Sequence, residues 1–169
     1  MANRFTTHFT NAERSKIYRA SKSKIKNSAD IYSIPKGKKK ISEREKIIDR
    51  FLSGKVDRII YCKALEADVI LRRKGIKDTS LHAARSYKST LAALNLEEAL
   101  KEAKKIKTVP IKRTSKNQKC FKCMHILACI VEHVGYAKIM VGEFYEVKNI
   151  PTPYAHYCIT HMSIKQIKK

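Results

Sequence analysis

The chain has 169 residues and a formal net charge of +22 at pH 7, with 37 Lys and Arg against 15 Asp and Glu. Its 43% of hydrophobic residues is enough to bury a core, and its five Gly and four Pro argue against a repeat or low-complexity protein. This excess of cations favours a polyanionic partner, because each neutralised phosphate releases condensed counterions, so nucleic acid is the expected partner.

The N-terminus is polar and carries no apolar signal region, and no apolar run approaches the roughly 20 residues that span a bilayer. We therefore expect a cytoplasmic protein that is neither secreted nor inserted in a membrane. Its five cysteines are then expected to be reduced.

Residues 1–41 are expected to form a basic arm that is partly helical. Thr10 and Glu13 have the spacing of a capping box, which predicts a helix running toward Lys26. The basic side chains of the arm are expected to contact phosphates, although for the loop at 36–40 the alternative is a solvated turn. These side chains are Arg14, Lys16, Arg19, Lys22, Lys24, Lys26, Lys36, Lys38, Lys39 and Lys40.

Residues 42–107 are expected to form a helical region. A second capping box, Ser42 and Glu45, predicts a helix through Phe51 that Gly54 ends. The apolar spacing over 56–73 predicts a longer core helix, which Gly75 ends. Two further helices are expected over 81–94 and 96–107.

Residues 108–169 are expected to form a small α+β unit rich in Cys and His. The spacing predicts a helix over 120–134 and strands over 136–141, 143–147 and 154–160. The predicted fold class is therefore α+β, with a helical N-terminal half followed by a small helix and an antiparallel sheet of three to four strands. Further phosphate contacts are expected from the basic runs at 72–74 and 104–107 and from Lys112, Arg113, Lys116 and Lys119.

Four of the five cysteines and four of the six histidines lie between Cys120 and His161. Cys120 and Cys123, together with Cys158 and His161, have the paired spacing of a tetrahedral zinc site. However, the first pair has no neighbouring turn former and Cys158 lies in an apolar run. The alternative is therefore cysteines that bind no metal and fill the core.

The same segment offers residues for ribonuclease chemistry without a metal. His125 and His156 could act as acid and base, because the pKa of histidine lies near neutrality. Lys138 could neutralise the crowded phosphate and Thr160 could donate a hydrogen bond. The alternative is that the histidines lie at the edge of the core. No phosphate-binding loop, H-E-x-x-H pattern or paired carboxylates of a two-metal nuclease are present.

Four short runs carry a resemblance to a known group of proteins. They are His125-Ile-Leu, Val134-Gly-Tyr-Ala-Lys138, Val141-Gly142 and Tyr154-Ala-His-Tyr-Cys-Ile-Thr160. Residues 95–164, which contain them, resemble the nuclease-like domains of phage and mobile-element polyvalent proteins, in the barnase, EndoU, colicin and RelE-like group. The resemblance implies helices followed by an antiparallel sheet that cuts RNA without metal, with His125, Lys138, His156 and Thr160 at the site. That group also includes inactive members that only bind.

The favoured function is a basic nucleic-acid-binding protein, with RNA preferred over DNA, that contacts mainly the phosphate backbone. It could be a phage or mobile-element factor. Tyr18, Tyr32, Phe121 and Tyr154 are candidates for stacking on unpaired bases. Two alternatives are a metal-independent endoribonuclease and an interaction protein whose basic surface binds an acidic protein partner.

Overall fold

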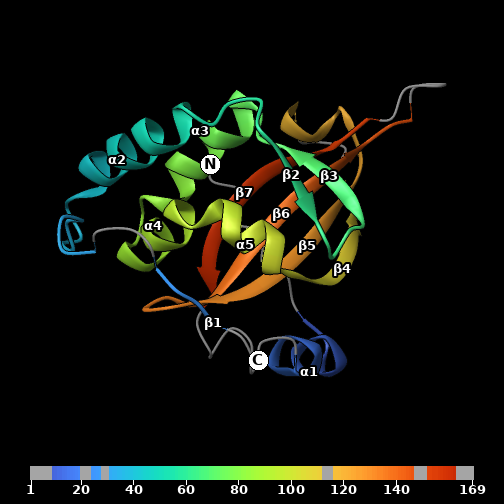
Figure 1. Cartoon of the computed structure of the whole chain (residues 1–169), viewed down its shortest axis with the longest axis horizontal. Helices are drawn as coiled ribbons and strands as arrows, with labels where there is room; N and C mark the ends of the chain where they lie inside the picture. The colour runs from blue at the N-terminus through green and yellow to red at the C-terminus, as the bar shows by residue number, and fades with distance from the viewer. Residues whose placement is uncertain (1–8, 20–23, 28–30, 112–115, 147–151, 163–169) are drawn as a thin grey trace.

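The computed structural model describes residues 9–19, 24–27, 31–111, 116–146 and 152–162. In these residues the chain folds as α+β, with five α-helices packed on a seven-stranded mixed sheet that curls strongly (Figure 1). The prediction of a helical N-terminal half followed by a three- to four-stranded antiparallel sheet is therefore wrong. Strands from each of the three predicted segments join the one sheet.

The sheet runs in the order β2–β3–β7–β6–β5, and both β1 and β4 pair with the remaining edge of β5. The pairs β3–β7 and β1–β5 are parallel, and the other pairs are antiparallel. The strands are β1 (Lys24–Ile25), β2 (Ile59–Cys62), β3 (Ala67–Ile70), β4 (Lys104–Pro110), β5 (Phe121–Val131), β6 (Gly135–Phe144) and β7 (Tyr154–Met162).

Four helices cover one face of the sheet, and α1 lies apart from them beside β4 (Figure 1). The helices are α1 (Asn11–Arg19), α2 (Ile41–Ser53), α3 (Arg73–Ala83), α4 (Tyr87–Leu94) and α5 (Leu96–Glu102). A short 3₁₀ turn, Lys116–Gln118, precedes β5. No helix in the described part of the chain has the length and apolar character needed to cross a membrane.

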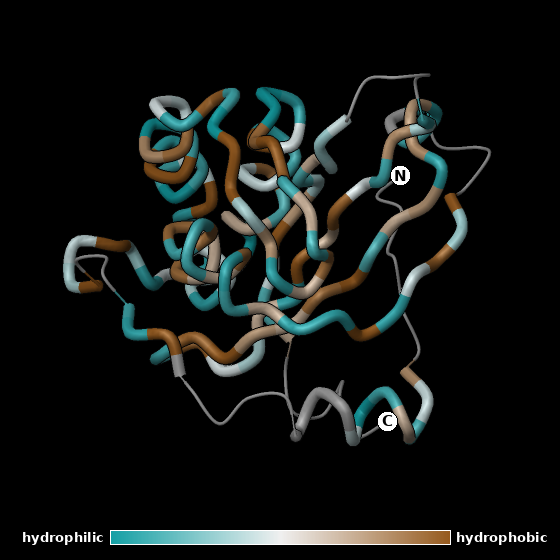
Figure 2. Tube along the Cα trace, turned by 45° about the vertical axis from the view of Figure 1, so that its right-hand side comes forward, coloured by the Kyte–Doolittle hydropathy of each residue, from teal (hydrophilic) through white to brown (hydrophobic). Residues whose placement is uncertain are grey.

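The main core lies between α2–α5 and the sheet, where Figure 2 shows hydrophobic residues on the inner sides of the elements. Leu52, Leu91 and Ile139 are fully buried there. Two smaller apolar clusters cover the other face of the sheet, one around Phe9 and Ile126 and the other around Phe121 and Met140. The central strands are therefore buried on both faces.

The helix predicted over 120–134 is instead β5, an 11-residue strand. Because β5 is buried on both faces, its sequence is a nearly continuous apolar run without the alternation that marks a half-exposed strand. Such a run cannot be told from a buried helix by its period alone. The two strands predicted over 136–147 are likewise one strand, β6.

The long helix predicted over 56–73 is instead the β2–β3 hairpin. Its turn places Glu66 at φ 50°, a conformation that no helix contains. Gly75, predicted to end that helix, lies in the first turn of α3. The helix predicted over 81–94 is divided at Ser86, whose side chain caps α4 by accepting from the Ser89 amide.

Several local predictions are confirmed. Thr10 and Glu13 form the capping box of α1, with the two reciprocal hydrogen bonds at 2.7 and 3.2 Å. Helix α2 ends before Gly54, as predicted. The strand predicted over 154–160 is β7.

Candidate functional site

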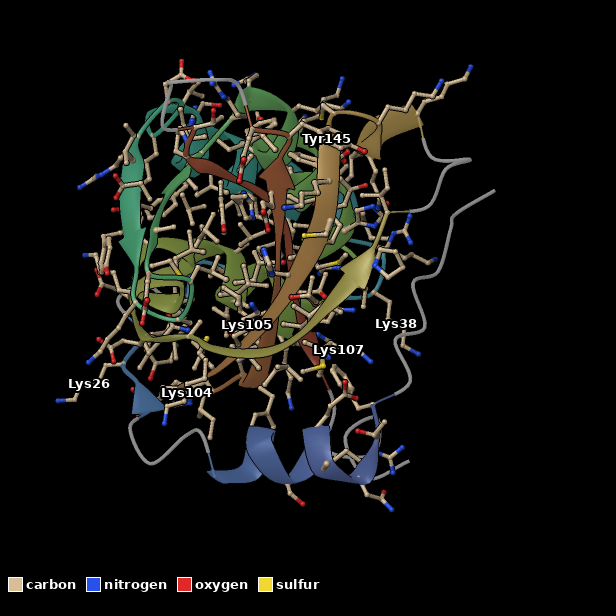
Figure 3. The ribbon with its side chains drawn as sticks, turned by 90° about the vertical axis from the view of Figure 1, so that its right-hand side faces the viewer. Lys26, Lys38, Lys104, Lys105, Lys107 and Tyr145 are labelled. Atoms are coloured by element: carbon tan, nitrogen blue, oxygen red, sulfur yellow. The ribbon has the colours of Figure 1, made fainter. Side chains whose placement is uncertain are left out.

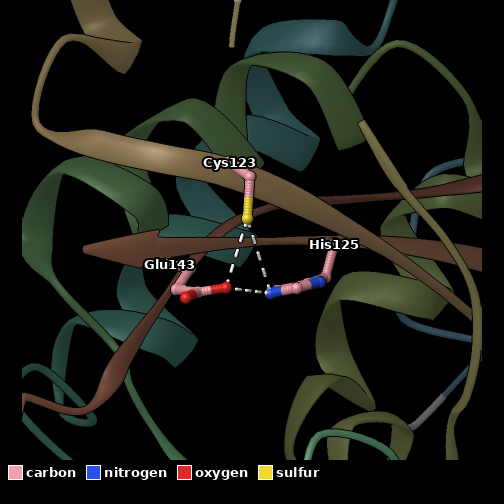
Figure 4. Close-up of side chains that lie close together, drawn as sticks. All are labelled: Cys123, His125 and Glu143. Carbon is pink, nitrogen blue, oxygen red and sulfur yellow. Dashed lines mark hydrogen bonds and ion pairs between the residues drawn. The ribbon is translucent and has the colours of Figure 1, made fainter. Parts of the chain in front are cut away.

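The sheet brings together three chemically active side chains, Cys123, His125 and Glu143 (Figure 4). Cys123 and His125 lie two residues apart on β5, so they project from the same face of the sheet. Glu143 lies directly opposite Cys123 in the antiparallel β5–β6 register. The cluster is therefore a product of strand pairing across 20 residues of chain.

Hydrogen-bonding distances join these three side chains (Figure 4). Oε2 of Glu143 lies 2.9 Å from Nε2 of His125 and 3.2 Å from Sγ of Cys123. Sγ and Nε2 are 3.8 Å apart. One carboxylate oxygen thus faces both the thiol and the imidazole.

Neighbouring residues fix the orientation of the cluster. The Thr108 hydroxyl, on β4, lies 2.9 Å from Nδ1 of His125. The ring of Tyr154, at the start of β7, stacks on the imidazole with centroids 5.3 Å apart. Lys122 pairs with the other oxygen of Glu143, Oε1, at 3.3 Å. His125 is buried, whereas Cys123 and Glu143 are partly exposed, so solvent can reach the cluster.

The surroundings shift the pKa of each member. Burial, followed by the hydrogen bond to Glu143, raises the pKa of the Cys123 thiol to about 11. Burial lowers the pKa of His125, although its bond to Glu143 acts in the opposite direction. Burial alone would raise the pKa of Glu143, but hydrogen bonds from Cys123, His125 and Lys122 hold it below its ordinary value. At neutral pH the cluster therefore contains a thiol, a neutral imidazole and a carboxylate.

The structure does not bring together the four residues predicted to hold zinc. Of these four residues, only Cys123 belongs to the cluster with His125 and Glu143. Among the described residues, that cluster is the group of three potential metal-ligand side chains that lie close enough to share an ion. Cys120 is exposed in the turn before β5. Cys158 is buried with Sγ 4.0 Å from the carbonyl oxygen of Asp78, and Nδ1 of His161 lies 2.6 Å from Oγ of Ser89 on α4.

The four residues predicted for catalysis lie on opposite faces of the sheet. His125 and His156 are both register neighbours of Val141, which faces the main core. Lys138 and Thr160 pair with each other three rows away, and side chains alternate along β6, so they project from the other face. His156 is buried under α3, with Nε2 3.1 Å from the Thr79 hydroxyl, and burial lowers its pKa to about 3.

The predicted phosphate-binding residues are spread over the molecule. Of those with described side chains, Arg14 is half-buried and the exposed ones are Lys26, Lys36, Lys38, Lys39, Lys40, Lys116 and Lys119. The side chains of Lys16, Arg19, Lys22, Lys24, Lys112 and Arg113 lie outside the described residues. The expected run at 104–107 lies along β4, where Figure 3 shows Lys104, Lys105 and Lys107. Lys107 pairs with Glu13 at 3.4 Å, whereas Lys104 and Lys105 are exposed and line a cleft of about 390 Å³ together with Lys63.

A second cleft, of about 410 Å³, lies where the first turn of α3 meets the ends of β5, β6 and β7. Cationic and aromatic side chains line it. They include Arg72, Arg73, Lys74, Phe121, Phe144 and Tyr157. Phe144 follows Glu143 on β6, so the aromatic side of this cleft and the Cys123 cluster project from opposite faces of the same end of the sheet.

The sequence contains signals for parts of both the cleft at the start of α3 and the Cys123 cluster. The run at 72–74 and Phe121 were each expected to contact nucleic acid, but nothing placed them in one cleft. Glu143 was missed because its position depends on the β5–β6 register, which a helix over 120–134 hides.

No protein-family model, curated protein or solved structure matches the chain. The resemblance to nuclease-like domains therefore stays a prediction, and function must be inferred from the geometry.

Proposed function

We propose that the chain binds single-stranded nucleic acid, with RNA preferred, and that the cleft at the start of α3 receives one nucleotide. The observation that carries this proposal is the combination of cations and aromatic rings around one cleft. Proteins that bind single strands commonly join a basic path for the backbone to aromatic rings on which unpaired bases stack. The net charge of +22 adds long-range attraction for any polynucleotide.

The start of α3 suits a phosphate group. Its N-cap residue, Arg72, has an extended backbone and makes no side-chain capping bond, so the amide groups of the first turn are free of a side-chain cap. The helix dipole and the side chains of Arg73 and Lys74 favour an anion there. Asp57 also lines the cleft and pairs with Arg72 at 3.4 Å, but exposed pairs of this kind contribute little and a phosphate can replace them.

The aromatic side of the cleft suits a base. Phe121 and Phe144 form a tilted pair with ring centroids 5.0 Å apart, and Phe144 and Tyr157 are partly exposed. A base that has left its stack can pack against these rings, which is a contact that single strands offer and duplexes do not.

The test measures binding of a labelled single-stranded RNA by fluorescence anisotropy at several salt concentrations. The cleft variant Arg72→Gln, Arg73→Gln, Lys74→Gln is compared with a matched variant, Lys46→Gln, Lys77→Gln, Lys88→Gln, which removes the same charge from exposed positions on α2, α3 and α4. If the cleft variant loses three phosphate contacts, the slope of log K against log salt becomes shallower by about 2. The matched variant is expected to change it much less.

Two further variants refine the assignment. Phe144→Leu is expected to cost about 1 kcal/mol or more of affinity, because it removes a stacking surface and leaves the charge unchanged. A third charge variant tests the cleft of about 390 Å³ beside β4 in the same way. It combines Lys63→Gln, Lys104→Gln and Lys105→Gln. If the cleft variant, the matched variant and the variant beside β4 all weaken RNA binding equally, the positive charge acts without a defined binding site and the proposal is wrong. An RNA that fails to bind at low salt, while an acidic polypeptide binds, would replace the proposal with a protein partner.

A further inference from the structure

We propose that Cys123, His125 and Glu143 bind one borderline divalent cation, of which zinc is the type, and leave a fourth coordination position open to solvent. The proposal goes beyond nucleic-acid binding and concerns residues that do not line the proposed nucleotide cleft. It also differs from the paired Cys120–Cys123 and Cys158–His161 site expected from the sequence, with which it shares only Cys123.

The spacing of the ligand atoms fits such an ion. Zinc bonds of about 2.3 Å to sulfur and 2.0–2.1 Å to nitrogen and oxygen, in a tetrahedron, place ligand atoms about 3.3–3.6 Å apart. The three separations here are 2.9 Å for Nε2 to Oε2, 3.2 Å for Sγ to Oε2 and 3.8 Å for Sγ to Nε2. Adjustments of a few tenths of an ångström on the three side chains would accommodate the ion.

The neighbouring groups leave the correct atoms available. Lys122 contacts Oε1 of Glu143, so Oε2 stays directed at the cluster. The Thr108 hydroxyl contacts Nδ1 of His125 and can accept a hydrogen bond from a protonated Nδ1, which leaves the Nε2 lone pair for a metal. A thiolate and a carboxylate together neutralise a 2+ ion, so the occupied site itself carries no net charge.

The protons balance in a simple way. In the metal-free cluster, the Cys123 thiol and the Nε2–H group of His125 both donate to Glu143. Metal binding forms the bond to sulfur and releases the thiol proton to solvent, while the imidazole proton moves from Nε2 to Nδ1. One proton is released for each ion bound.

The same cluster is poorly arranged as a cysteine–histidine nucleophile. In that arrangement one ring nitrogen of the histidine faces the thiol. A third residue forms a hydrogen bond with the other ring nitrogen and so orients the base. Here Glu143 contacts Nε2, the nitrogen nearer to Sγ, and accepts from the thiol as well. A negative carboxylate in this place keeps the proton on sulfur, whereas a cation in the same place removes it.

The exposure of the cluster favours an open fourth position. His125 is buried, but Cys123 and Glu143 border solvent, so water can complete the coordination. Three protein ligands and one water are the arrangement of reactive rather than closed structural zinc sites.

Cobalt titration of the full-length, metal-stripped protein tests the proposal. We expect one equivalent of Co²⁺ to bind, with a thiolate-to-cobalt charge-transfer band, and one equivalent of Zn²⁺ to displace it. Titrations in buffers of different ionisation enthalpy are expected to show about one proton released at pH 7. Cys123→Ser is expected to abolish the band, and Glu143→Gln, which preserves shape, is expected to weaken binding. Thr108→Val is expected to weaken it roughly tenfold to hundredfold.

The matched controls separate this site from the one expected from sequence. Cys120→Ser and Cys158→Ser change the two other cysteines of the site expected from the sequence and are expected to keep the band. Circular dichroism of each metal-free variant checks the fold, and Glu143→Gln serves if Cys123→Ser does not fold. The proposal is overturned if wild-type protein binds no stoichiometric Co²⁺. It is also overturned if the band survives in Cys123→Ser or if Glu143→Gln binds as tightly as wild type.

Discussion

Gly75 lies so close to His156 that a Cβ atom placed on it would be 2.1 Å from the His156 carbonyl oxygen. The first turn of α3 therefore rests directly on the backbone of β7, and this contact also shapes the proposed nucleotide cleft. The spacing depends on the absence of a side chain at Gly75 and not on an unusual backbone conformation.

Replacement of Gly75 by alanine is expected to destabilise the fold by about 2 kcal/mol or more, because the backbone of β7 cannot move aside cheaply. In most helices the same change would stabilise by up to about 1 kcal/mol. Gly54→Ala is the control, since a Cβ at Gly54 meets no atom within 4 Å. Urea unfolding measures both variants. A Gly75→Ala protein as stable as wild type would contradict the close packing of α3 on β7.

The burial of His156 predicts a dependence of stability on pH. Burial lowers its pKa from 6.5 to about 3, so the folded protein holds the neutral imidazole while the unfolded chain takes up a proton below about pH 6.5. This contribution to stability is complete above pH 6.5 and is lost as the pH falls toward 3, by up to about 1.4 kcal/mol per unit. Urea unfolding at several pH values is expected to give a smaller loss in His156→Gln. His133→Asn, at an exposed turn, is the control and should follow wild type.

Arg44 is expected to be essential for stability. It is 1% exposed, and its guanidinium donates to the carbonyl oxygens of Ala84, Pro35 and Gly37 at 2.7, 3.0 and 2.8 Å. Ala84 is the C-cap of α3, where the helix dipole favours a cation. Arg44→Met leaves these carbonyls without their donor and is expected to cost about 3 kcal/mol. The exposed Arg50→Met on the same helix is expected to cost less than about 0.5 kcal/mol in the same thermal unfolding measurement.

Labelled RNA incubated with the protein in EDTA is expected to stay intact. The residues predicted for metal-independent cleavage, His125 and His156 on one face and Lys138 and Thr160 on the other, cannot act on one phosphate in this arrangement. Electrophoresis of the recovered RNA measures the outcome. Cleavage in EDTA that is lost in both His125→Gln and Lys138→Gln would show that the sheet rearranges around a substrate.

The sequence predicted those elements whose signals are local. The capping box at Thr10 and Glu13, the helix ending before Gly54 and the strand β7 all depend on residues within a few positions of one another. The predictions failed for β5 and for the β2–β3 hairpin, because burial on both faces and a chance helical period removed the alternation that identifies strands.

The candidate sites show the same division. Residue type identified Cys123, His125 and the basic run at 72–74 as chemically interesting. Their actual partners, Glu143 and Phe144, lie on another strand, and only the register of β5 against β6 determines which of them faces the thiol. A one-residue shift in that register would exchange the two faces, so the site follows from the tertiary fold.

The place of β7 in the sheet has a consequence for synthesis on the ribosome. This strand, the last one in the described residues, lies between β6 and β3, and the β2–β3 hairpin joins the rest of the described sheet through it. While Tyr154–Met162 is still inside the ribosome, the nascent chain therefore contains two sheet fragments that are not joined. Both fragments have open edges, whatever helices have already formed. The sheet can then be completed only after this segment has emerged, and until that point both fragments keep edges that can pair with other chains.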